Sequence, residues 1–173
     1  MILAVNQMAF VALGSNLGDS HQIVLSAMDR LQESADTPLL KSSLWESDPV
    51  DCPPGSPLFV NAVVGLVPRA TETPESLLAR LQRLEFEFGR KRKQILNEPR
   101  ILDLDLIAFS DQTRATGELI LPHPRACNRA FVLKPFAEIA PDLVLPGQTK
   151  TIEEFAMRVS ADGTCRKDRA PRG

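Results

Sequence analysis

The sequence predicts an α+β fold, a ferredoxin-like split βαβ sandwich with two main helices on one face of an antiparallel sheet and additional helices near the C-terminus. Three observations predict it. The segments follow the order strand, helix, strand, strand, helix, strand; two further helical stretches come after the last strand; and two long loops interrupt the series. We expect the second face of the sheet to stay open and to carry the long loops, where binding residues tend to lie.

The first strand and helix are predicted by a change of hydrophobic period. Residues 8–13 are apolar and end in a glycine-bounded turn at residues 14–18. Ile23, Ala27 and Leu31 then recur at the spacing of an amphipathic helix. This part of the chain therefore predicts strand, turn and helix.

Two strands and a long loop are expected next. Residues 39–47 alternate between apolar and polar side chains, as a half-buried strand does. Residues 48–57 contain four prolines and a glycine and predict a loop. Residues 59–67 are apolar again and predict the next strand.

The second helix has both a start signal and a stop signal. Thr73 and Pro74 supply an N-cap and a proline at the first helical position, and an apolar stripe follows as far as Gly89. Residues 91–99 show no sustained period and predict a second loop. Residues 101–109 predict the strand that follows it.

The C-terminal part predicts two more helices, at residues 130–139 and 152–159, and then a polar tail. We expect one domain over residues 8–159 and disorder over residues 160–173. A chain of 173 residues with 43% hydrophobic content is enough for one core of ordinary size.

Composition narrows the class of protein. A net charge of −2 argues against a surface built to bind nucleic acid. Residues 1–7 lack the regions of a leader peptide, and no run approaches the roughly 18 apolar residues of a membrane span. The three cysteines are widely separated and match no metal or redox spacing. We expect a cytoplasmic protein that binds neither membrane nor nucleic acid.

Asp103 and Asp105 lie two residues apart in an otherwise apolar strand, which places both carboxylates on one face. Two like charges side by side are costly to bury unless a cation neutralises them, so the pair favours a divalent metal site. An edge strand with its polar face in water would give the same pattern. A basic run precedes the strand: Arg90, Lys91, Arg92, Lys93 and Arg100. A polyphosphate with its metal ion would satisfy both features.

Four segments of the chain, in this order, resemble the 6-hydroxymethyl-7,8-dihydropterin pyrophosphokinase family. They are residues 11–18, 59–62 and 89–105, and residues 122–124 with 128–133. The resemblance spans roughly residues 9–146 and includes the uncommon Pro-Arg-Ile-Leu-Asp-Leu-Asp of residues 99–105. It implies a transferase of folate biosynthesis that moves pyrophosphate from ATP to the hydroxymethyl group of a reduced pterin and releases AMP. Two Mg²⁺ ions are expected with the ATP.

The resemblance also implies roles for individual residues. Asp103 and Asp105 would bind the metal ions and would form the catalytic set with Arg92, Arg100 and His123. The residues expected to bind ATP are Leu78, Gln82, Glu85, Arg90, Arg92, Lys93, Arg100, Leu106, Ile120, His123 and Arg129. The residues expected to bind the pterin are Ser47, Asp48, Val50, Phe59, Asn61 and Phe131. Each has a simpler interpretation as well: core packing for the apolar residues and a solvated surface for the polar ones.

The chain departs from the family pattern at a few positions. Asn97 and Glu98 stand where many relatives carry Trp-Gly, so loop closure over the nucleotide is in doubt. Glu118, Pro124 and Asp48 replace residues that are basic, aromatic or proline in some relatives. None of these changes removes a metal ligand. They predict altered nucleotide affinity or loop kinetics before loss of activity.

Two other functions are compatible with this fold class. A nucleic-acid module would stack bases on sheet aromatics, but the chain has no tyrosine and carries two acids on the strand that phosphate would approach. A relative that binds pterin or ATP without turnover is the second. The sequence leaves the oligomeric state and the order of substrate binding open.

Overall fold

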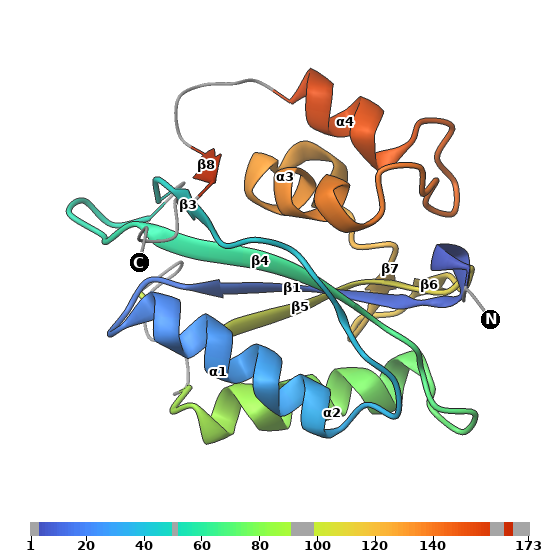
Figure 1. Ribbon diagram of the computed structural model, residues 1–173, viewed down its shortest axis with the longest axis horizontal. Coiled ribbons are helices and arrows are strands. Elements are labelled where there is room, and N and C mark those ends of the chain that lie inside the picture. The colour runs from blue at the N-terminus through green and yellow to red at the C-terminus, as the bar shows by residue number, and fades with distance from the viewer. Residues whose placement is uncertain (1–3, 50–51, 91–98, 160–164, 168–173) are drawn as a thin grey trace.

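The computed structural model describes residues 4–49, 52–90, 99–159 and 165–167. Its elements, in chain order, are η1 Val5–Gln7, β1 Ala9–Ser15, α1 Ser20–Glu33, β2 Leu40–Lys41, β3 Trp45–Ser47, β4 Phe59–Leu66, α2 Pro74–Glu87, β5 Asp103–Phe109, β6 Arg114–Ala115, β7 Ile120–Leu121, η2 Ala126–Asn128, α3 Ala130–Ile139, α4 Ile152–Arg158 and β8 Cys165–Lys167. Helices α1 and α2 lie on one side of the central sheet and α3 and α4 on the other (Figure 1).

The strand order confirms the predicted α+β topology. The main sheet runs β5-β1-β4-β3-β8, and its described pairings are antiparallel. The first and last elements of the split βαβ unit, β1 and β5, therefore lie side by side, as this arrangement requires.

The single strand expected over residues 39–47 is divided in two. Both β2 and β3 pair with β4, and Ser42 lies between them. The backbone N–H of Val63 donates to the Ser42 hydroxyl at 2.9 Å, while the Ser42 N–H donates to the Val63 carbonyl at 3.0 Å. A side-chain oxygen thus takes the place of a backbone acceptor, which interrupts the ladder without leaving a donor unpaired.

The first hydrophobic layer lies between the sheet and helices α1 and α2. Alternate strand residues such as Val11, Val64 and Leu104 pack there against Leu31 and Leu81. Asp19 caps α1, and Thr73 and Ser76 form a reciprocal capping box at the start of α2. The sequence predicted both helices and this face correctly.

The opposite face is covered by α3 at one end, so the expectation of an open face is wrong there. Phe10, Val63 and Ile107 pack against Leu133 and Phe136 of α3. The rings of Phe10 and Phe136 have centroids 4.8 Å apart. The physical reason is that α3 is apolar enough to need a covered face of its own, which the sheet provides.

Two short elements are not predicted by the sequence pattern. The β6–β7 hairpin follows β5. Residues 165–167, inside the segment expected to be disordered, form β8 and pair with β3 in register Ser47↔Cys165 to Trp45↔Lys167. For these three residues the expectation of disorder is wrong, because an unpaired strand edge offers them backbone partners. The rest of the expected tail, and the domain boundary at residue 159, stay predictions.

Among the described residues, no helix has the length and apolar character that crossing a membrane requires.

Candidate active site

One row of residues across the sheet forms the base of the site. Asp103 pairs with Gly14, Gly14 pairs with Asn61, and Asn61 pairs with Trp45. Register partners point to the same face of a sheet, so a carboxylate, a glycine, an amide and an indole lie in line on the α3 side. Asp105 lies in the next row, opposite Ala12. The prediction that both acids share one face is confirmed, since Leu104 and Leu106 between and beyond them are buried in the other face.

Asp103 is held by two arginines. Arg90 Nη1 donates to its Oδ1 and Arg100 Nη1 to its Oδ2, each at 3.1 Å. Arg90 also contacts the carboxylate of Glu85, which is only 4% exposed on α2. Arg90 follows Gly89, whose φ of +95° ends the helix and turns the chain toward the strand. Four of the predicted site residues therefore meet at the junction of α2 and β5.

Asp105 has no comparable pairing within the described part of the chain. Burial and the neighbouring Asp103 carboxylate raise the pKa of Asp105 to about 6, although Arg129, Arg100 and Arg90 act in the opposite direction. A half-buried carboxylate with a raised pKa beside a second carboxylate is a site that a divalent cation would stabilise. The donor set fits magnesium, which prefers carboxylate oxygens and commonly takes its remaining ligands from phosphates and water. Among the described residues, no group of three or more metal-ligating side chains is present, so the pair would depend on substrate oxygens.

Asn16 holds the backbone just before β5, and sequence reasoning assigned it no role. Its Oδ1 accepts the Arg100 backbone N–H at 2.9 Å, and its own N–H donates to the Arg100 carbonyl at 3.2 Å. Asn16 is 1% exposed. The turn after β1 thus holds the backbone of Arg100, three residues before Asp103 at the start of β5. This contact keeps the Arg100 side chain within reach of Asp103. Its place in the segment at residues 11–18 is the sequence signal that could have indicated this role.

His123 lies beside β5 because of an irregularity in that strand. The β1–β5 register shifts between Phe10 and Val11, and the carbonyl of Ile107 accepts the His123 backbone N–H at 2.8 Å. The Arg125 N–H donates to His123 Nδ1 at 3.2 Å. A neutral imidazole with an acceptor Nδ1 carries its proton on Nε2. Burial lowers the pKa of His123, and Arg129 and Arg125 lower it further, so the neutral form is favoured.

The residues expected to bind the pterin line the other half of the row. Asn61 is 4% exposed, and its Nδ2 donates to Ser47 Oγ at 2.8 Å and to the Trp45 carbonyl at 3.3 Å. These bonds fix the amide with Oδ1 on the side of Gly14, where a Cβ would lie 3.6 Å from it. Phe59 borders the same space, with Cδ1 3.8 Å from that Cβ position. Gly14 has no side chain, so nothing of its own occupies the position between Asp103 and Asn61 in this row.

Two further predicted residues, Arg129 and Phe131, lie at the start of α3. Arg129 is the N-cap residue of α3, and its guanidinium carbon lies 5.5 Å from the centre of the Phe131 ring. The charge of Arg129 also acts on both Asp105 and His123. The start of α3 therefore brings a positive charge near the carboxylate pair and His123.

Other predicted residues are not brought to this row. The Leu106 side chain is buried in the core under α1 and α2, and Leu78 packs against the same core, so the structure favours packing roles for both side chains. Gln82 is exposed on α2, and Ile120 is half exposed on β7. Arg92, Lys93 and Val50 lie outside the described residues, as do Asn97 and Glu98.

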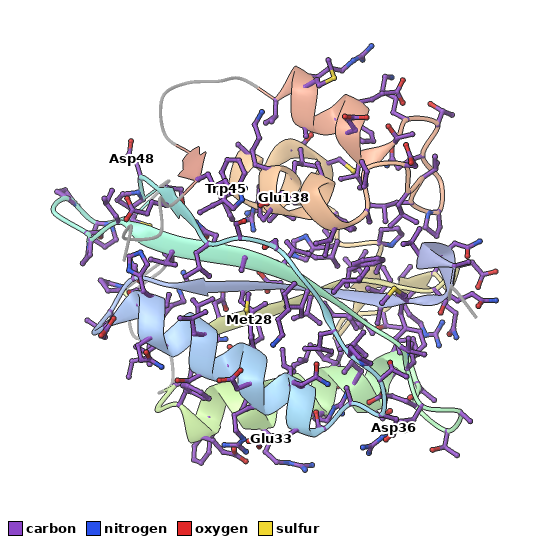
Figure 2. The ribbon with its side chains drawn as sticks, in the orientation of Figure 1. Met28, Glu33, Asp36, Trp45, Asp48 and Glu138 are labelled. Atoms are coloured by element: carbon purple, nitrogen blue, oxygen red, sulfur yellow. The ribbon has the colours of Figure 1, made fainter. Side chains whose placement is uncertain are left out.

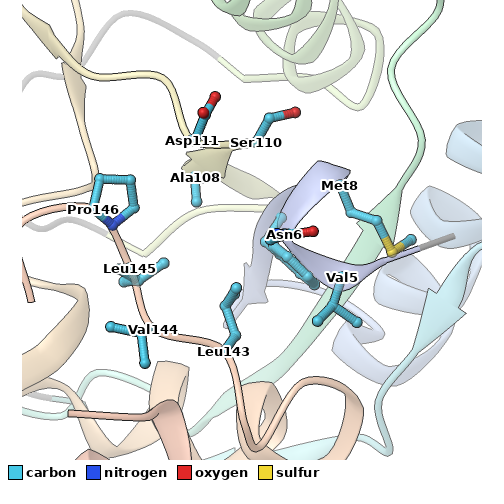
Figure 3. Close-up of a pocket in the computed structure, with 11 residues that line it drawn as sticks. Val5, Asn6, Met8, Ala108, Ser110, Asp111, Leu143, Val144, Leu145 and Pro146 are labelled. Carbon is cyan, nitrogen blue, oxygen red and sulfur yellow. The ribbon is translucent and has the colours of Figure 1, made fainter. Parts of the chain in front are cut away.

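A separate hollow lies at the far end of the sheet (Figure 3). It is lined by η1, the start of β1, the end of β5 and residues 143–146, including Met8, Ser110 and Asp111. The row of Asp103 and Gly14 is at the opposite end of the same strands. This hollow is therefore not part of the site described above.

An antiparallel sandwich that presents paired carboxylates among arginines is the arrangement expected of a metal-dependent enzyme that acts on phosphate groups. The model of the 7,8-dihydro-6-hydroxymethylpterin-pyrophosphokinase family, HPPK, matches residues 10–141. The chain belongs to this family, and the resemblance found in its motifs is confirmed. Family membership also favours an enzyme over a nucleic-acid module.

Curated relatives agree with the family match. The chain is 41% identical over 141 residues to the 2-amino-4-hydroxy-6-hydroxymethyldihydropteridine pyrophosphokinase of Pseudomonas aeruginosa, covering 81% of this chain and 85% of the relative. It is 35% identical over 156 residues to the protein of the same name from Bacillus subtilis, covering 90% and 91%. The match to the folic acid synthesis protein fol1 of Pneumocystis carinii, 38% identical over 154 residues, covers 89% of this chain but only 20% of that protein.

Solved structures support the fold. A Plasmodium falciparum HPPK-DHPS variant crystallised with pterin and p-hydroxybenzoate superposes with a TM-score of 0.69 at 13% identity, covering 92% of this chain and 46% of that chain. At this identity the likeness concerns the arrangement of helices and strands.

Proposed function

We propose that this protein transfers pyrophosphate from Mg²⁺-ATP to the hydroxymethyl group of 6-hydroxymethyl-7,8-dihydropterin, releasing AMP, as a step of folate biosynthesis. The observation that carries the proposal is the line Asp103, Gly14, Asn61 across the sheet, with arginines at its acidic end. One end suits a metal-bound polyphosphate and the other a flat heterocycle. Their spacing along one row brings the two substrates together.

At the nucleotide end, Asp103 and Asp105 would hold two Mg²⁺ ions. When bound, these ions would neutralise phosphate charge and lower the pKa of the attacking hydroxyl. Arg90, Arg100 and Arg129 supply fixed positive charge around the same carboxylates. Arginine pairs with two phosphate oxygens at once, so these side chains can both orient the triphosphate and stabilise the charge that develops during transfer.

His123 contributes a hydrogen-bond donor at this end. With Nδ1 occupied by the Arg125 N–H, the neutral ring presents Nε2–H. This group can donate to a phosphate oxygen at neutral pH without first taking up a proton. We therefore assign His123 to binding and orientation of the phosphates, not to removal of a proton.

At the pterin end, Asn61 Oδ1 is the acceptor that faces the space above Gly14. The pterin edge carries N–H donors that match a fixed acceptor, and its flat ring matches the phenyl groups of Phe59 and Phe131. Ser47 holds the Asn61 amide in this orientation. Asp48 follows at the start of the loop and would border the ring.

The test is to incubate the protein with ATP, Mg²⁺ and the reduced hydroxymethylpterin and to measure AMP and ADP. We expect one AMP for each pterin diphosphate, and Asp103→Ala to abolish turnover. Asp111→Ala is the matched control, because Asp111 lies past the other end of β5 and is exposed. Production of ADP would contradict pyrophosphate transfer. Absence of both nucleotides, with both substrates still bound, would identify a relative without turnover. A cytoplasmic location remains a prediction beside this proposal.

A further inference from the structure

Glu138, in the last turn of α3, holds strand β3 from above the sheet. Trp45 Nε1 donates to its Oε1 at 2.5 Å, and the Ser43 hydroxyl donates to its Oε2 at 2.9 Å. Lys167 of β8 pairs with Oε2 at 3.1 Å. Figure 2 labels Trp45 and Glu138 close together where β3 passes under α3. We call these four residues the Glu138 anchor.

The carboxylate of the anchor is ionised. Burial opposes the charge, but the donors Trp45, Ser43 and Lys167 together lower the pKa of Glu138 below its ordinary value. Charge-assisted hydrogen bonds of this kind are about twice as strong as bonds between neutral groups. The anchor therefore restrains β3 more firmly than ordinary surface contacts do.

Strand β3 needs such a restraint because its own ladder is short. It has three residues, it is separated from β2 by the Ser42 interruption, and it leads into the proline-rich segment after Ser47. Short strands with few ladder bonds open easily. The side chains of Ser43 and Trp45 add two attachments to a rigid helix at this point.

The same strand holds the amide of Asn61. The carbonyl of Trp45 and the hydroxyl of Ser47 accept both described hydrogen bonds from Asn61 Nδ2. Trp45 therefore has two contacts in series: its indole is fixed by Glu138, and its carbonyl fixes Asn61. A shift of β3 away from β4 would release the amide, which could then turn its Nδ2 toward the space above Gly14.

We propose that Glu138 is a positioning residue for pterin recognition, acting through β3 to keep the Asn61 acceptor directed at the substrate. This inference rests on the proposed function of the site, in which Asn61 Oδ1 reads the pterin. Asp103, Arg90 and Arg100 belong to β5 and its neighbours and share no described contact with the anchor. Loss of the anchor should thus affect the pterin and leave the nucleotide unaffected.

The central experiment compares Glu138→Gln with wild type. The variant keeps the shape of the side chain but loses the charge that receives Lys167 and two donors. We expect the KM for the reduced pterin to rise about tenfold, which corresponds to the loss of one or two such bonds, while the KM for ATP and kcat change less than about twofold. Glu153→Gln on α4 is the charge-matched control, since Glu153 is exposed and its side chain has no described contact with β3. It should leave all three constants unchanged.

Two more variants keep the test decisive if Glu138→Gln is poorly folded. Trp45→Phe removes only the indole donor, and should raise the pterin KM in the same direction. In an Asn61→Ala background, Glu138→Gln should cause no further loss of pterin affinity, because the acceptor that it positions is gone. Equal losses for pterin and ATP, or full additivity with Asn61→Ala, would overturn the proposal.

Binding measurements separate this inference from the proposed function. Calorimetric titration of 6-hydroxymethyl-7,8-dihydropterin, in the presence of Mg²⁺ and a nonhydrolysable ATP analogue, does not require turnover. A wild-type protein that binds the pterin in a Glu138-dependent and Asn61-dependent way but makes no AMP would contradict the proposed activity and support the anchor. If the wild-type protein forms AMP but its binding of the pterin is unchanged by Glu138→Gln, the proposed activity is supported and the anchor is contradicted.

Discussion

Strands β1, β4 and β5 share one face on the α3 side of the sheet, but the two ends of that face differ. At one end Phe10, Val63 and Ile107 fill the space under the helix. At the other end the equivalent positions are Gly14, Asn61 and Asp103, which leave space and polar atoms instead. The same three strands run through both ends. The comparison shows that one scaffold serves as core and as site according to the size and polarity of alternate residues.

The largest expected effect comes from removing a charge at the polar end of this face. Asp105→Asn should lower kcat by about a thousandfold or more, because it removes a metal-binding charge from the transferring group. The same change should raise the stability of the metal-free protein, since it removes a half-buried charge that the neighbouring Asp103 carboxylate repels. Turnover assays and thermal unfolding in chelator would check both.

A core variant should give the opposite result. Phe136→Ala, at the covered end, should lower the free energy of unfolding by about 3–5 kcal/mol and leave the turnover of the folded molecules nearly unchanged. Denaturant titration and active-site-normalised kinetics would measure it. A loss of activity in the folded fraction would mean that the two ends are coupled.

Two glycines on this face provide a sharper comparison. A Cβ at Gly65 would lie 2.8 Å from Phe10 Cε1, whereas a Cβ at Gly14 would meet nothing closer than 3.6 Å. Gly65→Ala should therefore reduce stability, by about 1–3 kcal/mol for an overpacked core. Gly14→Ala should leave stability nearly unchanged but raise the pterin KM about tenfold, because the methyl group occupies the substrate space. Unfolding curves and pterin titrations of both variants would test this comparison. A loss of pterin affinity in Gly65→Ala with no such loss in Gly14→Ala would contradict it.

The free energy of unfolding should depend on pH through Asp105, at the polar end of this face. The pKa of Asp105 is raised in the folded state to about 6 from an ordinary value of 3.8, so the folded protein binds this proton more tightly than the unfolded chain. Its favourable contribution is present below the ordinary pKa and is lost as the pH rises through about 6. In chelator, wild type should lose stability relative to Asp105→Asn between these values, and excess Mg²⁺ should reduce the difference. Parallel pH curves for the two proteins would contradict the raised pKa.

The smallest effect is expected at His123. Because its pKa is lowered and its Nδ1 is occupied, the ring is neutral at pH 7 and acts as a donor. His123→Gln, which can present a donor, should retain more activity than His123→Ala, with a kcat loss of about tenfold or less. Neither rate should show a His123-dependent change between pH 7 and 8. A strong rise in that range that disappears in both variants would identify a proton-accepting role instead.

Much of this arrangement could be predicted from local patterns. The order of strands and helices and the two capped helices follow from hydrophobic period and helix signals at residues 20–33 and 73–89. The common face of Asp103 and Asp105 follows from strand geometry alone. Most of the predicted pterin residues within the described chain also lie in or beside one row of the sheet, because their motif segments fall on neighbouring strands.

Other features depend on contacts between distant segments. The packing of α3 on the sheet and the pairing of residues 165–167 with β3 both join segments that lie far apart in the chain, and residues 165–167 follow β3 by more than a hundred residues. Asn16 and Glu138 carry no recognisable local signal of their roles, because each acts on a partner that the fold brings to it. For Leu106 the strand position was predicted, but its side chain packs into the core.

The sequence by itself determined the family, the main helices and strands and the residue types of the site, because these depend on periodicity and on motif residues that lie close together in the chain. The tertiary structure decided which of those residues meet. Register across β5, β1, β4 and β3 sets the distance from the carboxylates to the amide, and packing of α3 decides how much of that face stays accessible. Those quantities depend on long-range pairing and on side-chain volume, which no local pattern contains.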